Sequence, residues 1–203
     1  MLADALPFLA CPQCGAELRM TDSALRCPLS HTFDVARQGY VNLLSGKGSG
    51  LPGDTAAMVA ARAQFLGAGH FGPIVRAVVA AAQRALADRP AGCVVDIGAG
   101  VGHYLAPVLD ALPGRIGLAL DVSKFALRRA ARAHPRMGAV GCDAWQGLPV
   151  RTGSAALALS IFAPRNPAEI HRILCDGGTL IVVSPTTRHL SVQIGRASCR
   201  ERV

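Results

Sequence analysis

The sequence lacks several features that would point to other classes of protein. It has no apolar run long enough to cross a membrane and no signal peptide, which predicts a cytosolic (cytoplasmic) chain without a membrane partner. It has no internal repeats. It is also poor in acid, with 13 Asp and Glu against 21 Lys and Arg and a net charge of +8. This balance favours an anionic partner such as RNA, although a GC-rich genome that encodes Arg in place of Lys produces the same bias.

The length and the cysteine content limit the class of protein. The 203 residues, 51% of them hydrophobic, are enough for one α/β domain with a small appendage. Seven cysteines in a cytosolic chain indicate metal ligands or free thiols, because disulfides are rare in that compartment.

Two pairs of potential metal ligands lie near the N-terminus. Cys11 and Cys14 form a C-x2-C knuckle, and Cys27 and His31 follow as C-x3-H after an interval of twelve residues. Three thiolates and one imidazole fill a tetrahedral Zn²⁺ shell. Neither half can bury a core alone, so the metal is expected to hold this module together. The alternative is free thiols at chance spacing.

A glycine turn after a short apolar strand is the central motif. Asp96 is followed by Gly98, Gly100 and Gly102, and a helix can begin directly afterwards. Glycine lets a ligand approach the backbone, and the free N–H groups of the new helix face that ligand. The pattern G-x-G-x-G after an acid resembles motif I of class I S-adenosylmethionine (SAM) methyltransferases. Asp121 ends the next strand, about 20 residues past the glycines, where an acid can accept hydrogen bonds from a ribose diol.

The rest of the chain reads as alternating helices and strands. Expected helices run over 55–66, 73–87, 105–112, 124–134 and 168–174, and expected strands over 93–95, 116–120, 137–141, 154–161 and 179–184. Met58, Ala61 and Phe65 share one face of the first helix. The arginines of the helix 124–134 are interpreted as a solvated face. Asp143 follows the third strand, where it is either an acceptor for an adenine amino group or a simple loop acid.

The ordered motifs together closely resemble bacterial 23S rRNA (guanine-N1)-methyltransferases, a family that includes enzymes linked to tylosin-type macrolide resistance. The segments that carry the resemblance are the C-x2-C…C-x3-H knuckles, FDVARQGYVNLL (33–44), AARAQFLGAGHF (60–71), VVDIGAGVGHY (94–104), LDVSKFALRRAA (120–131), SIFAPRN (160–166) and VVSPTTRHL (182–190). The resemblance covers nearly all of residues 11–190. The presence of the zinc module in the same chain as the glycine turn is what makes the resemblance specific to this family.

The resemblance implies a role for each matching position. Cys11, Cys14, Cys27 and His31 are implied to hold zinc. The residues implied at the SAM site are Phe71, Asp96, Gly98, Gly100, Gly102, Tyr104, Leu105, Asp121, Asp143 and His189. Phe71 stands where Tyr is usual, and Ala99 where Cys is common. The implied fold is α/β, a Rossmann-like parallel sheet that is incomplete at the C-terminus, with the zinc module at the N-terminus.

The implied reaction is SAM-dependent methylation of guanine N1 in a hairpin of 23S rRNA. The target base is expected to flip out of its hairpin, with Phe162 and Pro164 stacking against it. A base must remove the N1 proton, and His103, Asp143 and His189 are candidates by position. Two alternatives stay open: a SAM-dependent enzyme acting on a small molecule, and an inactive RNA-binding fragment. A homodimer is also left open.

The expected domains are a zinc-binding, RNA-recognising module over 1–44, a linker with helices over 45–92, and a partial SAM-binding domain over 93–190. The linker begins with a glycine-rich loop, 45–54, expected to be mobile and near the cleft. Residues 191–203 lack helical or strand periodicity and do not resemble the family. They are interpreted as a non-native tail on a truncated chain.

Overall fold

A parallel β-sheet forms the centre of the molecule. The computed structural model describes residues 2–44, 53–87 and 91–186. In these ranges the main sheet has six strands, all parallel to their neighbours. In spatial order they are β4 (Tyr40–Asn42), β7 (Met137–Gly141), β6 (Gly117–Asp121), β5 (Cys93–Ile97), β8 (Ala155–Ile161) and β9 (Leu174–Val183). The parallel sheet implied by the family resemblance is confirmed.

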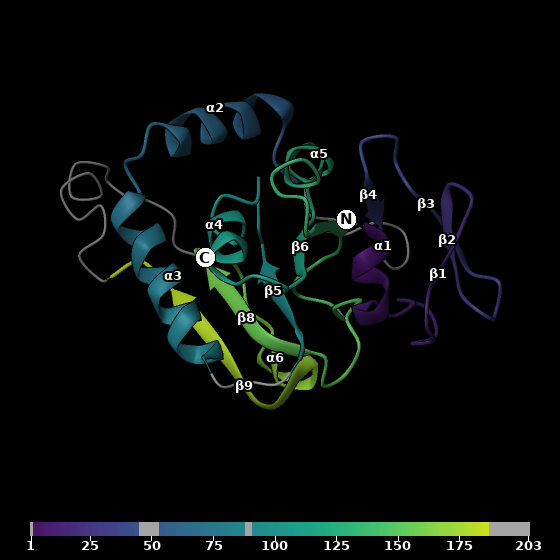
Figure 1. The fold of residues 1–203 in the computed structure, drawn as a ribbon. Coiled ribbons are helices and arrows are strands. Elements are labelled where there is room, and N and C mark those ends of the chain that lie inside the picture. The colour runs from purple at the N-terminus through teal and green to yellow at the C-terminus, as the bar shows by residue number, and fades with distance from the viewer. Residues whose placement is uncertain (1, 45–52, 88–90, 187–203) are drawn as a thin grey trace, which may run out of the picture.

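Helices cover both faces of this sheet, as a parallel sheet with apolar side chains on both faces requires (Figure 1). One apolar cluster joins α3 (Gly72–Leu86), α4 (Leu105–Ala111) and α5 (Lys124–Ala130) to one face. A second cluster joins α1 (Leu2–Ala5) and α6 (Pro167–Ile173) to the other. The remaining helix, α2 (Ala56–Gly67), crosses the end of the sheet toward which the strands point (Figure 1).

The first forty residues form a small antiparallel sheet that shares the core of the large one. The short helix η1 (Leu6–Phe8) precedes it, and its strands are β1 (Arg19–Thr21), β2 (Ala24–Arg26) and β3 (Thr32–Asp34). Leu9, Leu18, Leu25 and Phe33 belong to the same apolar cluster as α1 and α6. The small sheet therefore packs on the main sheet through a continuous core.

Residues 33–44, expected to end the zinc module, connect the small sheet to the main sheet. Thr32–Asp34 pairs within the small sheet, whereas Tyr40–Asn42 pairs with β7 as the edge strand of the main sheet. Of the linker expected over 45–54, only Gly53 and Asp54 are among the described residues. The expected tail, 191–203, lies entirely outside them.

Side-chain caps fix the helices near their predicted starts. The hydroxyls of Thr55 and Ser123 accept from backbone N–H groups in the first turns of α2 and α5. The helix expected over 124–134 is shorter than predicted, because α5 ends at Ala130 and turns follow. There His134 precedes Pro135, a position that disfavours helical backbone, and its Nδ1 accepts from Arg136 N at 3.0 Å.

No single helix in the described ranges is long and apolar enough to cross a membrane. The pair α2 and α3, bent by 81°, reaches that length and composition only when its two helices are counted together.

Candidate functional site

Two adjoining cavities open at the carboxyl end of the parallel strands. We name the first, of about 270 Å³, the acidic cavity, because Asp54, Asp121 and Asp143 line it. We name the second, of about 330 Å³, the aromatic cavity, because Phe65, Phe71, Tyr104 and Phe162 line it. Arg62, Gly98 and Phe162 line both cavities. Their position agrees with the ligand crevice expected at the carboxyl ends of an open parallel sheet.

The glycine turn separates the two cavities and leaves no room for a side chain at its first position. Gly98 has φ +71°, and a Cβ there would lie 2.6 Å from Ala163 Cβ. Only glycine meets both conditions without displacing the chain. The N–H groups of Gly98 and Ala99 both donate to Leu120 O at 2.9 Å, which ties the turn to β6. The predicted turn is thus held against the strand that ends in Asp121.

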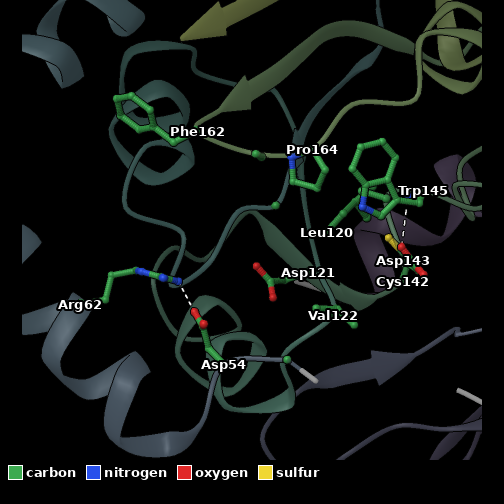
Figure 2. A pocket seen from close by; sticks show the side chains of 14 residues that line it. Asp54, Arg62, Leu120, Asp121, Val122, Cys142, Asp143, Trp145, Phe162 and Pro164 are labelled. Carbon is green, nitrogen blue, oxygen red and sulfur yellow. Dashed lines mark hydrogen bonds and ion pairs between the residues drawn. The ribbon is translucent and has the colours of Figure 1, made fainter. Parts of the chain in front are cut away.

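Asp121 lies at the centre of the acidic cavity (Figure 2). Its Oδ2 accepts from Gly100 N at 2.8 Å and its Oδ1 from Ser123 N at 2.8 Å. Burial raises the pKa of the Asp121 carboxyl, and these two N–H donors partly offset that effect. Each carboxylate oxygen keeps a further lone pair, so the side chain can still accept from a ligand's hydroxyls.

Asp96 is a buried acid without its full set of hydrogen bonds. The residue is 2% exposed, and its Oδ2 has no hydrogen-bond partner among the described residues. Burial, together with the nearby Asp121, raises the pKa of Asp96 to about 8. A cationic group in the aromatic cavity would satisfy this oxygen and stabilise its charge. SAM has such a group, its ammonium, so the donor set of the cavity fits the cofactor that the sequence implied.

His103 presents a second unsatisfied buried atom to the same cavity. Its Nε2 has no hydrogen-bond partner in the described chain, and its ring meets that of Tyr104 edge-on at 5.0 Å. Burial lowers the pKa of His103. The imidazole is therefore neutral near pH 7 and one of its ring nitrogens can accept a proton.

Asp143 lies in the acidic cavity, with both carboxylate oxygens already engaged. Oδ1 accepts from Trp145 N at 3.0 Å and Oδ2 from Gln146 Nε2 at 3.2 Å. These bonds fix the direction of the carboxylate in the loop after β7. Each oxygen retains acceptor capacity, so the carboxylate can still accept from a ligand's amino group.

An aromatic cluster lines the mouth of the aromatic cavity. The Phe71 ring lies 6.0 Å from that of Phe162 and 5.6 Å from that of Phe65, both edge-on. Phe162 has φ +53°, a strained backbone conformation for a bulky residue, and it remains 44% exposed. Strain at an exposed aromatic beside a cavity is typical of a binding role. Pro164 lines the neighbouring acidic cavity.

The structure adds three residues that the sequence did not single out as part of the site. Asp54 and Arg62 form an ion pair at the edge of the acidic cavity (Figure 2). Ser123 Oγ donates to Asp54 O at 2.8 Å, which docks the segment before α2 onto the start of α5. The third residue is Phe65. The sequence placed it with Met58 on one face of the helix that is now α2, but not in the site. Both side chains are about half exposed, so that face turns away from the core.

Two of the predicted cofactor residues that the structure describes line neither cavity. Gly102 faces the sheet, where a Cβ would lie 3.0 Å from Met137 Sδ. Leu105 is fully buried at the start of α4. Both residues pack on the side of the turn that faces the core, away from the cavities. His189 lies outside the described residues.

The four predicted metal ligands converge. The ligand atoms of Cys11, Cys14, Cys27 and His31 all lie within 4.8 Å of one another. Cys14 Sγ is 3.7 Å from Cys27 Sγ, and His31 Nδ1 is 3.3 Å from Cys27 Sγ. Zinc–sulfur bonds of about 2.3 Å in a tetrahedron place two sulfur atoms about 3.7 Å apart. The spacing and the donor set both fit zinc.

Comparisons with known proteins agree with both parts of the chain. Residues 9–47 match the zinc-ribbon family described as "RlmA, N-terminal". The chain is 53% identical to the 23S rRNA (guanine(748)-N(1))-methyltransferase of Streptomyces fradiae over 191 residues, which is 94% of this chain and 68% of that relative. It is 51% identical over 212 residues to the "Putative 23S rRNA (guanine-N(1)-)-methyltransferase" of Micromonospora griseorubida, which is 97% of this chain and 72% of the relative.

A solved structure shares the fold. It is titled a "putative s-adenosyl-l-methionine-dependent methyltransferase" of Methanococcus maripaludis. The match has a TM-score of 0.52 at 21% identity and covers 74% of each chain.

Proposed function

Because the chain belongs to the 23S rRNA (guanine-N1)-methyltransferase family, we propose that it methylates N1 of a guanine in a hairpin of 23S rRNA. The activity is SAM-dependent, and the zinc ribbon is part of the same family architecture. The observation that carries the proposal is the 53% identity to a relative of that activity, which extends over 94% of this chain and so includes both the ribbon and the cleft.

We assign the cofactor to the two cavities from the chemistry of their donors. Asp121 accepts from the ribose hydroxyls in the acidic cavity, and Asp143 from the adenine amino group. Asp96 accepts from the ammonium in the aromatic cavity. When bound, SAM supplies a methyl group made electrophilic by its sulfonium. The residues of this chain orient the cofactor, and the Gly98 turn lets it lie against the backbone.

The guanine is assigned to the exposed aromatic side of the cleft. A base that has left its hairpin loses its stacking partners, and Phe162 and Pro164 replace them. The Phe71 ring supports Phe162 edge-on from the other side. Holding N1 in line with the methyl group provides much of the rate enhancement, because it removes the entropy cost of bringing the two together.

We propose His103 as the acceptor of the N1 proton. It is the candidate whose Nε2 is buried and unpartnered in the described chain, and its lowered pKa keeps it neutral. Asp143 is less suited, because both of its carboxylate oxygens already accept hydrogen bonds from its own loop.

The test is methylation mapping of 23S rRNA by mass spectrometry. Ribosomal RNA from a host lacking the activity is incubated with the protein and SAM, and nucleotides are analysed after digestion. One N1-methylguanine in a hairpin is expected. Gly98→Val, whose side chain fills the cofactor path, is the inactive control. Turnover of small molecules without any change in the RNA would contradict the proposal.

We propose three further properties of the protein. The protein acts in the cytoplasm, where ribosomes are. Methylation of a drug-contacting guanine gives tolerance to tylosin-type macrolides, measured as a higher inhibitory concentration in cells expressing the protein than in cells expressing Gly98→Val. A homodimer, tested by sedimentation, would place two ribbons on one RNA.

A further inference from the structure

A row of positive charges without ion-pair partners lies on the exposed face of α5 and on the turn that follows it. Lys124, Arg128, Arg129 and Arg132 are all exposed, and none has an ion-pair partner in the part of the chain that the structure describes. No acid occurs in the sequence between Asp121 and Asp143. A merely solvated face usually mixes both signs, which makes this segment unusual.

These cations border a shallow groove. The groove, about 560 Å³, is lined by Ala56 and Val59 of α2 and by Phe125, Arg128, Arg129 and Arg132. We name it the arginine groove. Figure 1 shows α2 passing beside α5 at this place. The α2 helix, Ala56–Gly67, contains no acid, so both walls are free of negative charge. The floor is partly apolar, and Arg128 lies 5.5 Å from the Phe125 ring centre, which restrains its side chain.

The arginine groove is continuous with the proposed active site. A hollow of about 280 Å³ lies between them and shares Asp54 and Val122 with the acidic cavity and Phe125 with the groove. Lys124 also lines this hollow. The hollow shares Asp54 with the acidic cavity, and this carboxylate is already paired with Arg62.

We propose that the arginine groove binds phosphates of the RNA strand that flanks the target guanine. Positions four residues apart on a helix lie about 6 Å apart along its axis, so Lys124 and Arg128 can meet successive phosphates of one strand. Guanidinium groups bind phosphate oxygens in a bidentate manner. The groove thus holds the hairpin while the base occupies the aromatic side of the cleft. This inference rests on the proposed function.

The test compares two triple variants with the same change in charge. The first is Arg128→Gln/Arg129→Gln/Arg132→Gln. The matched control is Arg76→Gln/Arg84→Gln/Arg151→Gln, which removes three exposed arginines away from the groove. The affinity for a 23S rRNA hairpin is measured at several salt concentrations. The groove variant should lower the slope of log affinity against log salt by about 2 to 3, since each lost phosphate contact removes about 0.7–0.9.

Kinetic and folding readouts complete the test. The groove variant should raise KM for RNA at least tenfold, with kcat at saturating RNA and the Kd for SAM unchanged. Arg128→Lys/Arg129→Lys/Arg132→Lys should restore the slope. If the triple Gln variant fails to fold, the three single Gln variants decide, each with an expected slope decrease of about 0.7–0.9.

The inference is overturned if the groove variants keep the slope and affinity of the control. It is also overturned if the Lys variant behaves like the Gln variant. Failure of the proposed function looks different, because the wild-type protein would then bind RNA through the groove yet leave every guanine unmodified.

Discussion

We expect Asp96 to couple cofactor binding to proton release. Its pKa is raised to about 8, so at pH 7 the free protein carries a proton there, whereas an ammonium partner requires the carboxylate. Binding of SAM should therefore release a proton at pH 7. The affinity should rise with pH, by at most about tenfold per unit, and level off above pH 8.

Calorimetry in buffers of different ionisation enthalpy measures this release directly. Asp96→Asn should weaken SAM binding and abolish the release. Proton uptake by the wild-type protein, or a pH dependence that survives in Asp96→Asn, would show that another group is responsible.

His103 provides a second prediction at the scale of one side chain. As the proposed acceptor it must be neutral, so kcat should rise with pH through its lowered pKa, below 6.5, and then stay constant. His103→Gln should lower kcat about a hundredfold, with little effect on the affinity for RNA or SAM.

The control for His103 is His171→Gln, on the outer surface of α6. A His103→Gln variant with the wild-type rate and pH profile would assign proton removal to another group or to solvent.

At the scale of the elements, α1 packs closely on β7 at a glycine. A Cβ at Gly138 would lie 2.7 Å from Ala5 Cβ. Gly138→Ala should lower the free energy of unfolding by about 1–3 kcal/mol, because α1 must move away from the sheet. Thermal or urea unfolding measures the change.

Gly67→Ala is the matched control, since nothing lies within 4 Å of a Cβ there. It is expected to be neutral or slightly stabilising. Equal stability of both variants would mean that α1 is not seated on β7.

The sequence predicted the elements that carry their own pattern. β5, β7 and β8 are fully buried and mostly apolar, and Thr55 and Ser123 cap α2 and α5 by local hydrogen bonds. β4 has no such pattern. Its three residues become a strand because β7, far along the chain, offers a parallel edge. The strand β1 is exposed at every position, so no alternation marks it.

Within the site, the sequence likewise predicted the residues that belong to local motifs and missed those that tertiary contacts bring in. Asp96, Gly98 and Asp121 follow from strand ends and glycine spacing, which are local. Phe65 and Arg62 could not be found in this way, because their role depends on how α2 crosses the sheet. In the sequence of a helix, residues that face solvent cannot be distinguished from residues that line a cavity.

At the scale of the whole molecule, the zinc ribbon and the SAM-binding sheet share one apolar core. We predict about one zinc per chain. Cys14→Ser should lose the metal and lower the melting temperature of the entire protein, since β4 and the ribbon's apolar residues leave the sheet edge exposed. If the sheet instead folded independently of the ribbon, Cys14→Ser would unfold the ribbon alone.

Metal analysis, a thermal scan and hydrogen exchange of β7 distinguish the two outcomes. Unchanged protection of β7 in Cys14→Ser would show that the sheet is independent of the ribbon. Zinc-free wild-type protein, purified without chelator, would remove the metal site itself.

The pairing of β4 with β7 also sets an order of events during synthesis. Tyr40 pairs with Ala139, so the edge strand must wait for about a hundred residues before its partner leaves the ribosome. The ribbon can take up zinc early, since β1 to β3 pair only with one another. The apolar residues by which the ribbon packs on the main sheet, however, stay exposed until that sheet has formed. We expect stalled nascent chains that end before β7 to hold metal yet remain sensitive to protease between residues 35 and 44, and to become resistant once residue 141 has emerged.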